Sequence, residues 1–138
     1  MKPTLFLIAI ALSIACAVSA IAQDNTIGVT PDEMKLQETK SLGPIILLRG
    51  DPANSGPYVA RLKVPPNDVS SPHTHRQAEN ITVISGWIGF GLGWVFEKSK
   101  GRVLPAGSFF YLPANTPHFA WTGPEGAVIQ IHGVGPFP

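Results

Sequence analysis

The most restrictive feature of the sequence is a succession of short apolar segments that begins at Ile45 and is interrupted by turn-forming residues. Fourteen glycines and fourteen prolines supply much of this punctuation, and neither residue forms a repeating tract. Many short segments with Gly/Pro turns are typical of β-sandwiches and β-barrels. The sequence therefore predicts a single all-β domain over residues 45–138, with strands at 45–48, 58–64, 81–84, 87–96, 103–104, 108–112, 119–121 and 127–132.

The first 22 residues differ in composition from the rest. Lys2 is their only charged residue, an apolar run occupies residues 5–18, and Ala20-Ile21-Ala22 is a small-x-small pattern. These features are typical of a secretory signal peptide, here residues 1–22, cleaved after Ala22. We expect a periplasmic or secreted protein. A lipoprotein anchored through Cys16 is less favoured, because Ser13 stands where a lipobox normally has leucine.

The mature chain predicted by this cleavage has little to bind polyanions or membranes. The apolar run is shorter than the roughly 18 residues that span a bilayer, and no later segment reaches that length, so we expect no stable membrane span. Removing Lys2 leaves nine basic and nine acidic residues from the original ten and nine. A formal charge of zero does not favour nucleic acid as a partner. Removing Cys16, the only cysteine, excludes disulfides, so stability must come from a packed core or a bound metal.

Residues 23–44 read as an N-terminal arm that contains a short helix. Thr30 is a helix cap, Pro31 suits the first helical position, and Glu33 lies three residues after the cap. This combination satisfies free backbone N–H groups at a helix start. We expect the helix to end before Ser41.

The stretch HTHRQAENITVISG, residues 73–86, carries the first candidate ligands. On a strand, His73 and His75 project to the same side about 7 Å apart, so two imidazoles can converge on one ion. Glu79 shares a face with the apolar residues that follow it, where a lone carboxylate is costly to bury unless a cation lies beside it. We expect Gly86 to close this strand with a turn.

A third histidine, His118, directly follows the rigid turn formed by residues 113–117, which contains two prolines. The turn holds the imidazole in place before any metal binds. Three histidines and one carboxylate leave open positions on a six-coordinate metal, and open positions are where a substrate or dioxygen binds.

Two spaced motifs resemble those of the cupin superfamily. His73-x-His75-x3-Glu79-x6-Gly86 is similar to the first cupin motif, and Gly107-x5-Pro113-x-Asn115-x2-His118 is similar to the second. The resemblance covers roughly residues 45–132. It implies a small antiparallel jelly-roll barrel with one divalent metal held by His73, His75, Glu79 and His118.

Three positions depart from the cupin motifs. Asn67 and Asn115 stand where the motifs have glycine, and Thr122 stands where the second motif ends in asparagine. Asparagine tolerates the left-handed backbone that glycine usually supplies, so Asn115 is a mild change. None of the three is one of the implied ligands.

The resemblance implies several functions for such a site. One is a metal-dependent enzyme of the oxygenase or isomerase type that acts on a small molecule. The alternatives are a non-catalytic periplasmic metal- or ligand-binding protein and a metal that only stabilises the barrel. Mn or Fe is the first choice of metal by resemblance, and the donor set also suits Zn, Ni, Cu or Co. Family members often form homodimers, for which residues 23–50 are available.

Three further residues are candidates for the substrate pocket. His132 is the only unassigned histidine and hence the candidate catalytic base; it shares a strand face with Gln130. If that face points inward, both residues contact the substrate, and otherwise His132 is an ordinary strand histidine. Arg76 could clamp an anionic substrate, although a solvated loop arginine is the more ordinary interpretation.

Overall fold

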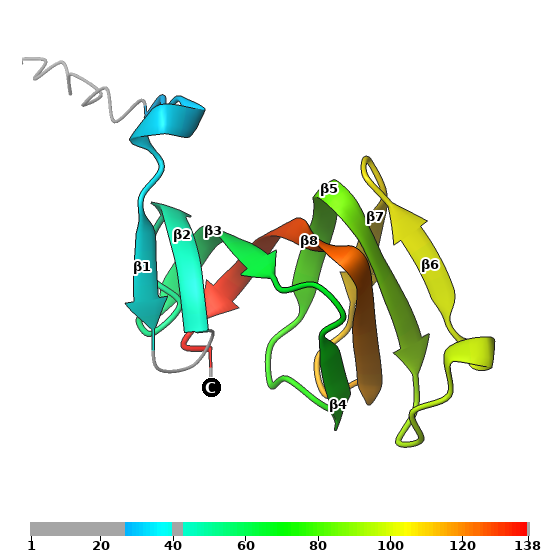
Figure 1. Ribbon diagram of the computed structural model, residues 1–138. Helices are drawn as coiled ribbons and strands as arrows, with labels where there is room; N and C mark the ends of the chain where they lie inside the picture. The colour runs from blue at the N-terminus through cyan, green and yellow to red at the C-terminus, as the bar shows by residue number, and fades with distance from the viewer. Residues whose placement is uncertain (1–26, 40–42, 138) are drawn as a thin grey trace, which may run out of the picture.

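The computed structural model describes residues 27–39 and 43–137, and these form an antiparallel all-β structure (Figure 1). The predicted signal peptide therefore lies outside the described residues. The strands are β1 (Leu36–Thr39), β2 (Gly43–Arg49), β3 (Gly56–Val64), β4 (Val69–His73), β5 (Glu79–Leu92), β6 (Arg102–Pro105), β7 (Phe109–Leu112) and β8 (His118–Gly135). Two short 3₁₀ turns, η1 (Pro31–Glu33) and η2 (Lys98–Lys100), complete the elements.

Two long strands, β5 and β8, hold the sheet together. The continuous order is β1-β2-β3-β8-β5-β6, with β4 paired to β8 and β7 paired to β5. The second half of β8 pairs with β3, whereas its first half pairs with β4. Likewise, the first half of β5 pairs with β7 and the second half with β6. Each long strand therefore pairs with two shorter strands, β8 with β3 and β4, and β5 with β7 and β6 (Figure 1).

β5 and β8 are longer than the strands that the sequence predicted. We predicted a turn at Gly86 and a break between residues 121 and 127, but both strands run through these points. Gly86 has φ +66° and lies in a stretch where the register with β8 shifts twice. A Cβ atom there would come 2.2 Å from the carbonyl oxygen of Gly126. The glycine thus permits a sharp bend without ending the strand.

The interior between the strands is largely apolar and contains a few buried polar side chains. Buried aliphatic side chains of β2, β3, β5 and β8 pack together, among them Ile45, Ile81, Val83 and Ile131. Glu79 and His118 are also buried, with 3% and 4% of their surface exposed. Burial of such groups needs partners, and this places the candidate site inside the fold.

The predicted N-terminal helix is wrong in extent. Only the single turn η1 forms, and the Glu33 carboxylate accepts the backbone N–H of Thr30 at 2.7 Å, as the capping pattern predicted. The chain then enters β1, which pairs with β2 from Leu36 to Thr39. Strand pairing satisfies the backbone groups that a longer helix would have satisfied, and short isolated helices are marginal.

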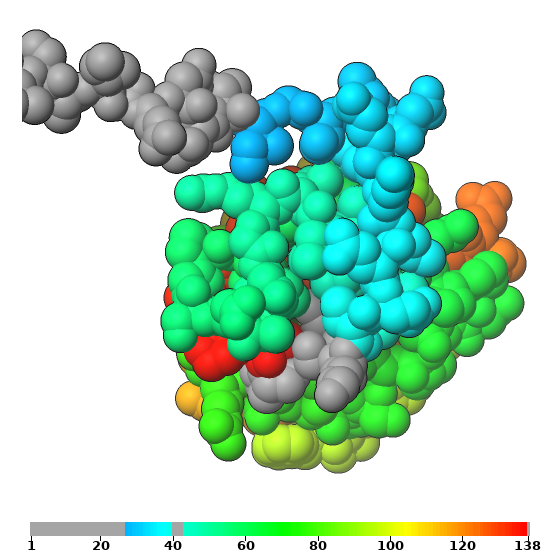
Figure 2. All heavy atoms as spheres, turned by 90° about the vertical axis from the view of Figure 1, so that its left-hand side faces the viewer, coloured from blue at the N-terminus to red at the C-terminus, as the bar shows by residue number. Residues whose placement is uncertain are grey.

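Figure 2 shows that the β1–β2 hairpin forms the outer surface at one end of the molecule, with C-terminal residues lying beside it. The backbone N–H of Phe137 donates to the carbonyl of Pro52 at 2.6 Å, which ties the C-terminal segment to the turn after β2. No helix in the described part of the chain is long and apolar enough to cross a membrane.

Candidate metal centre

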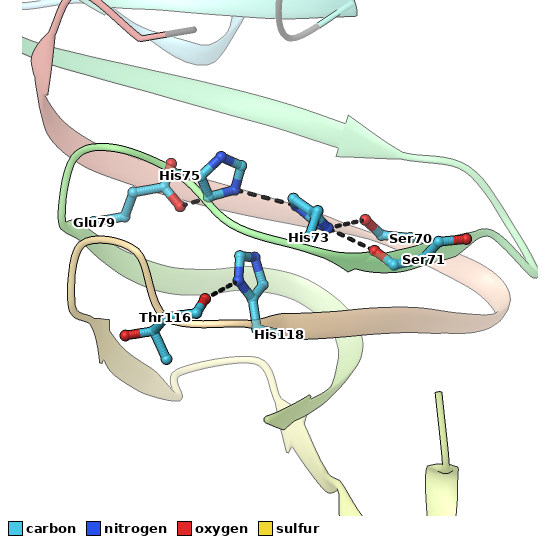
Figure 3. Close-up of polar contacts among 7 residues, drawn as sticks. All are labelled: Ser70, Ser71, His73, His75, Glu79, Thr116 and His118. Atoms are coloured by element: carbon cyan, nitrogen blue, oxygen red, sulfur yellow. Dashed lines mark hydrogen bonds and ion pairs between the residues drawn. The ribbon is translucent and has the colours of Figure 1, made fainter. Parts of the chain in front are cut away.

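The three predicted histidine ligands meet inside the fold (Figure 3). His73 ends β4 and is the register partner of His118, the first residue of β8. His75 lies two residues beyond His73, outside β4. One ring nitrogen from each of the three imidazoles lies within 4.8 Å of the other two. Two motifs that are far apart in sequence therefore place their imidazole nitrogens close together.

A backbone hydrogen bond joins the two loops that carry the ligands. The N–H of Asn115 donates to the carbonyl of His75 at 2.7 Å. Both asparagines at motif glycine positions have left-handed backbones, with φ 54° at Asn67 and 57° at Asn115. This confirms the expectation that asparagine reproduces the glycine conformation at Asn115.

Backbone carbonyls orient two of the imidazoles. His73 Nδ1 lies 2.6 Å from the carbonyl oxygen of Ser71, and His118 Nδ1 lies 2.9 Å from that of Thr116. A carbonyl can only accept, so each Nδ1 carries the proton and each Nε2 keeps its lone pair. Metal-binding histidines are usually held in this way, through a hydrogen bond from the other ring nitrogen.

The spacing of the donor nitrogens fits a shared cation. His73 Nε2 and His75 Nε2 are 3.2 Å apart. Nitrogens about 2.1 Å from one ion are roughly 3.0 Å apart at a right angle and roughly 3.4 Å apart at a tetrahedral angle. The observed distance lies between these values, so an imidazole pair of this geometry suits either coordination type.

Glu79 lies at the edge of the histidine group. Its Oε2 is 3.7 Å from His75 Nε2, whereas its Oε1 is buried with no hydrogen-bond partner. A carboxylate with an unsatisfied buried oxygen is costly unless a cation or proton compensates it. Glu79 is therefore placed to complete a metal site, although the tight group consists of the three histidines alone.

Burial shifts the pKa values of Glu79, His75 and His118 in the directions that favour their neutral forms. Burial raises the pKa of Glu79 to about 7. Burial, followed by His118 and His73, lowers the pKa of His75 to about 4. Burial also lowers the pKa of His118. Neutral imidazoles are the form that binds metal, and His75 and His118 are in that form at neutral pH, whereas a protonated Glu79 would release its proton to bind a cation.

A cavity of about 520 Å³ adjoins the histidines. Its walls are mostly apolar side chains on β3, β5, β7 and β8. They include Leu62, Val64, Ile81, Ile88, Phe90, Phe110, Ile129 and Ile131. Cavities of this size and character are typical of small-molecule sites.

His132, Gln130 and Arg76 were considered for a substrate pocket, and none of them lines the cavity beside the histidines. Ile129 and Ile131 point into it, and strand side chains alternate, so Gln130 and His132 lie on the outer face of β8. There the two side chains contact each other at 2.9 Å, and Arg61 Nε donates to Gln130 Oε1 at 2.9 Å. Arg76 is exposed beside the histidine loop.

Two residues near the centre were missed by sequence reasoning. Phe137 lines the cavity, and its ring lies 4.7 Å from that of His75 between centroids. Tyr58 is 2% exposed, and its hydroxyl has no hydrogen-bond partner. Both come from segments distant in sequence from the two motifs, and no local pattern around either of them indicates a site.

Comparisons with known proteins concern the sequence and the fold. No protein-family model matches the chain. A putative germin-like protein 9-2 of Oryza sativa subsp. japonica is 32% identical over 87 residues, which are 61% of this chain. The chain spans only 41% of that relative's length.

Solved structures show the fold more directly. The polyketide cyclase RemF from Streptomyces resistomycificus superposes with a TM-score of 0.66 at 20% identity, covering 82% of each chain. An RmlC-like cupin from Shewanella frigidimarina gives a TM-score of 0.59 at 17% identity, covering 77% of this chain and 87% of its own. KdgF from Halomonas sp. gives 0.58 at 20% identity, covering 77% and 91%.

Proposed function

The chain has the cupin fold, and we propose that it is a metal-binding cupin whose centre binds and transforms a small molecule. The observation that carries this proposal is the convergence of three imidazoles within 4.8 Å, two of them oriented by backbone carbonyls. We further propose Glu79 as the fourth ligand, through Oε2. Mn or Fe remains the preferred metal, with Zn, Ni, Cu or Co as alternatives that the donor set also accommodates.

The chemistry would combine the metal with the residues around it. A bound divalent ion would supply Lewis-acid polarisation of a substrate oxygen. Burial raises the pKa of Glu79 to about 7 in the metal-free protein. As a ligand of a divalent ion Glu79 would instead bind as the carboxylate, so its role would be coordination. The apolar walls exclude water and align the substrate beside the histidines. These features are compatible with isomerase- or cyclase-type chemistry and with oxygenase chemistry, and the resemblance to a polyketide cyclase favours an enzyme.

Metal binding is tested by equilibrium dialysis and isothermal titration calorimetry on the purified chain. We expect one divalent ion per chain. His73→Ala or His118→Ala should abolish tight binding, because each removes one of three converging nitrogens. His132→Ala serves as the matched control, since His132 lies on the outer face of β8 and should leave binding unchanged. Equal metal affinity in wild type and His118→Ala would refute the proposal.

Export and assembly are also proposed. We propose that residues 1–22 direct secretion, which predicts a mature N-terminus at Gln23 in the exported protein. Intact-mass measurement of the periplasmic fraction tests this. We further propose a homodimer that uses the β1–β2 hairpin, for which light scattering of the purified protein should give twice the chain mass.

A further inference from the structure

The charge of the cavity wall limits what the centre can bind. Among the residues that the structure describes, no lysine or arginine lines the cavity. The ionisable residues on its wall are the three histidines, Glu79 and Asp68. An anionic group that enters beyond the metal centre would thus meet no cationic side chain, and along the buried apolar walls it would also lose its hydration.

Asp68 stands at the other end of the cavity from the metal centre. Its backbone N–H donates to Thr122 Oγ1 at 3.0 Å, and its carbonyl accepts the N–H of Thr122 at 3.0 Å. Thr122 lies four residues along β8 from His118, a span of roughly 13 Å on a strand. A ligand that extends from the histidines along β8 would therefore approach Asp68, an exposed residue of the cavity wall.

We propose that the site takes a largely apolar molecule whose only acidic or anionic atoms are the oxygens that reach the metal centre. This inference rests on the proposed function, because it assumes that the histidines hold a metal. The cavity disfavours dicarboxylates, and any other molecule with a second anionic group, because that second group meets no cationic side chain. It accepts a neutral or cationic group at the Asp68 end.

A matched pair of probes tests the charge selection alone. 3,4-Dihydroxyphenylacetamide and 3,4-dihydroxyphenylacetate share a catechol that can bind a metal and nearly the same shape, and they differ in one negative charge. Calorimetric titration into the Zn²⁺-loaded protein, corrected for each probe's affinity for free Zn²⁺, should show at least fivefold tighter binding of the amide. A smaller preference, or a preference for the acid, overturns the inference.

The Asp68→Lys variant identifies the residue responsible. It places a cation at the exposed end of the cavity, so the preference for the amide should shrink at least twofold. Asp32→Lys, on the exposed turn η1 away from the cavity, should keep the wild-type preference. An unchanged preference in Asp68→Lys overturns the role of Asp68. Failure of the wild type to retain Zn²⁺ instead overturns the proposed function and this inference with it.

A second and independent observation concerns Tyr58. Within the described residues, the buried side-chain polar atoms without a hydrogen-bond partner are the Tyr58 hydroxyl and Glu79 Oε1. Both residues are register partners of Gly133, Tyr58 from β3 and Glu79 from β5. A Cβ atom at Gly133 would lie 2.6 Å from the Tyr58 hydroxyl, so this oxygen occupies the space above the glycine. The two residues that carry these unpartnered atoms thus flank one position that lacks a side chain.

The properties of Tyr58 suit a hydrogen-bond donor. Burial, followed by the charge of Glu79, raises the pKa of Tyr58, so its hydroxyl keeps its proton at every physiological pH. Its ring lies edge-on to Phe137 at 6.5 Å between centroids, which limits the positions that the hydroxyl can adopt.

The geometry points to Tyr58 as a positioning residue for Glu79. In the metal-bound protein its hydroxyl would donate to Oε1 after a side-chain rotation, and this would leave Oε2 directed at the histidines. The role again depends on the proposed function, in which Glu79 is a ligand.

Tyr58→Phe removes the hydroxyl and keeps the ring, so it tests positioning without creating a cavity. We expect Zn²⁺ affinity to fall 10- to 100-fold, as for other residues that orient metal ligands. The melting temperature of the metal-free protein should not fall, because no hydrogen bond is lost in that state. Tyr111→Phe, at a residue that is 57% exposed, should change neither quantity.

A double-mutant cycle separates positioning from general damage. In a Glu79→Gln background, Tyr58→Phe should cost less than twofold in Zn²⁺ affinity, because the carboxylate it orients is absent. Unchanged Zn²⁺ affinity in Tyr58→Phe alone, or an equal loss in both backgrounds, overturns the role. Absence of Zn²⁺ binding in the wild type overturns the proposed function itself.

Discussion

Glu79 is a buried carboxylate whose protonation should be visible in the stability of the metal-free protein. Its pKa is about 7 in the fold, against 4.5 for the unperturbed group. Between these values the folded state holds a proton that the unfolded state has released, so stability falls as pH rises from 4.5 to 7. The full cost, roughly 3 kcal/mol for such a shift, is present above pH 7.

Glu79→Gln should remove this cost. In the presence of a chelator, the variant should gain stability over wild type as pH rises from 4.5 to 7.5, by up to roughly 3 kcal/mol. Urea unfolding at several pH values measures the difference. Lowered pKa values at His75 and His118 act in the opposite sense, since they cost stability as pH falls below 6.5, but they contribute to both proteins. Glu38→Gln, at an exposed residue of β1, is the control. A pH-independent difference would contradict the prediction.

At this same scale, sequence reasoning found the three histidines because spacing and strand alternation constrain them directly. It left two interpretations of His132 open, a pocket residue and an ordinary strand histidine, for a physical reason. The inner face of a strand depends on every bulge before it, and β8 reaches His132 only after its pairing with β5 has shifted register. The contributions of Tyr58 and Phe137 depend on contacts between distant segments, which no local pattern encodes.

At the scale of elements, the glycines of β5 create space for aromatic rings of β8. A Cβ atom at Gly89 would lie 1.9 Å from the ring of Trp121, and one at Gly91 would lie 2.2 Å from the ring of Phe119. Phe96 covers the same rings at 5.1 and 6.2 Å between centroids. The sequence places these glycines inside a predicted strand, but only the pairing of β5 with β8 explains why they are there.

Gly91→Ala should therefore destabilise the protein by about 1–3 kcal/mol through overpacking against Phe119. Gly28→Ala is the control, since nothing lies within 4 Å of its added Cβ. The double variant Gly91→Ala/Phe119→Leu should lose less stability than the two single variants lose in sum, because the smaller side chain leaves room for the methyl group. Chemical denaturation of the wild type and of the four variants measures these differences in stability. A wild-type stability for Gly91→Ala would contradict this packing account.

For the whole molecule, the proposed metal centre joins segments that are distant in the sequence. His73 and His75 follow β4, Glu79 begins β5, and His118 begins β8. β5 pairs with the shorter strands β6 and β7, and β8 pairs with β3 and β4. A cation bound by these residues links elements that must all be in place for the fold to exist, so its binding energy adds to the stability of the folded state.

We therefore expect a large thermal shift on metal binding. Free metal at 100 times its Kd should stabilise the protein by about 2.7 kcal/mol. For a domain of this size that is a rise of roughly 10 °C in Tm. Scanning calorimetry with Zn²⁺ and with chelator measures the shift. The Tm of His118→Ala should differ little between Zn²⁺ and chelator, because one of the three nitrogens is missing. The Tm of His132→Ala should shift as much as that of the wild type. A Tm that does not respond to metal in the wild type would mean that the three imidazoles serve packing alone, and that the cavity beside them works without a cation.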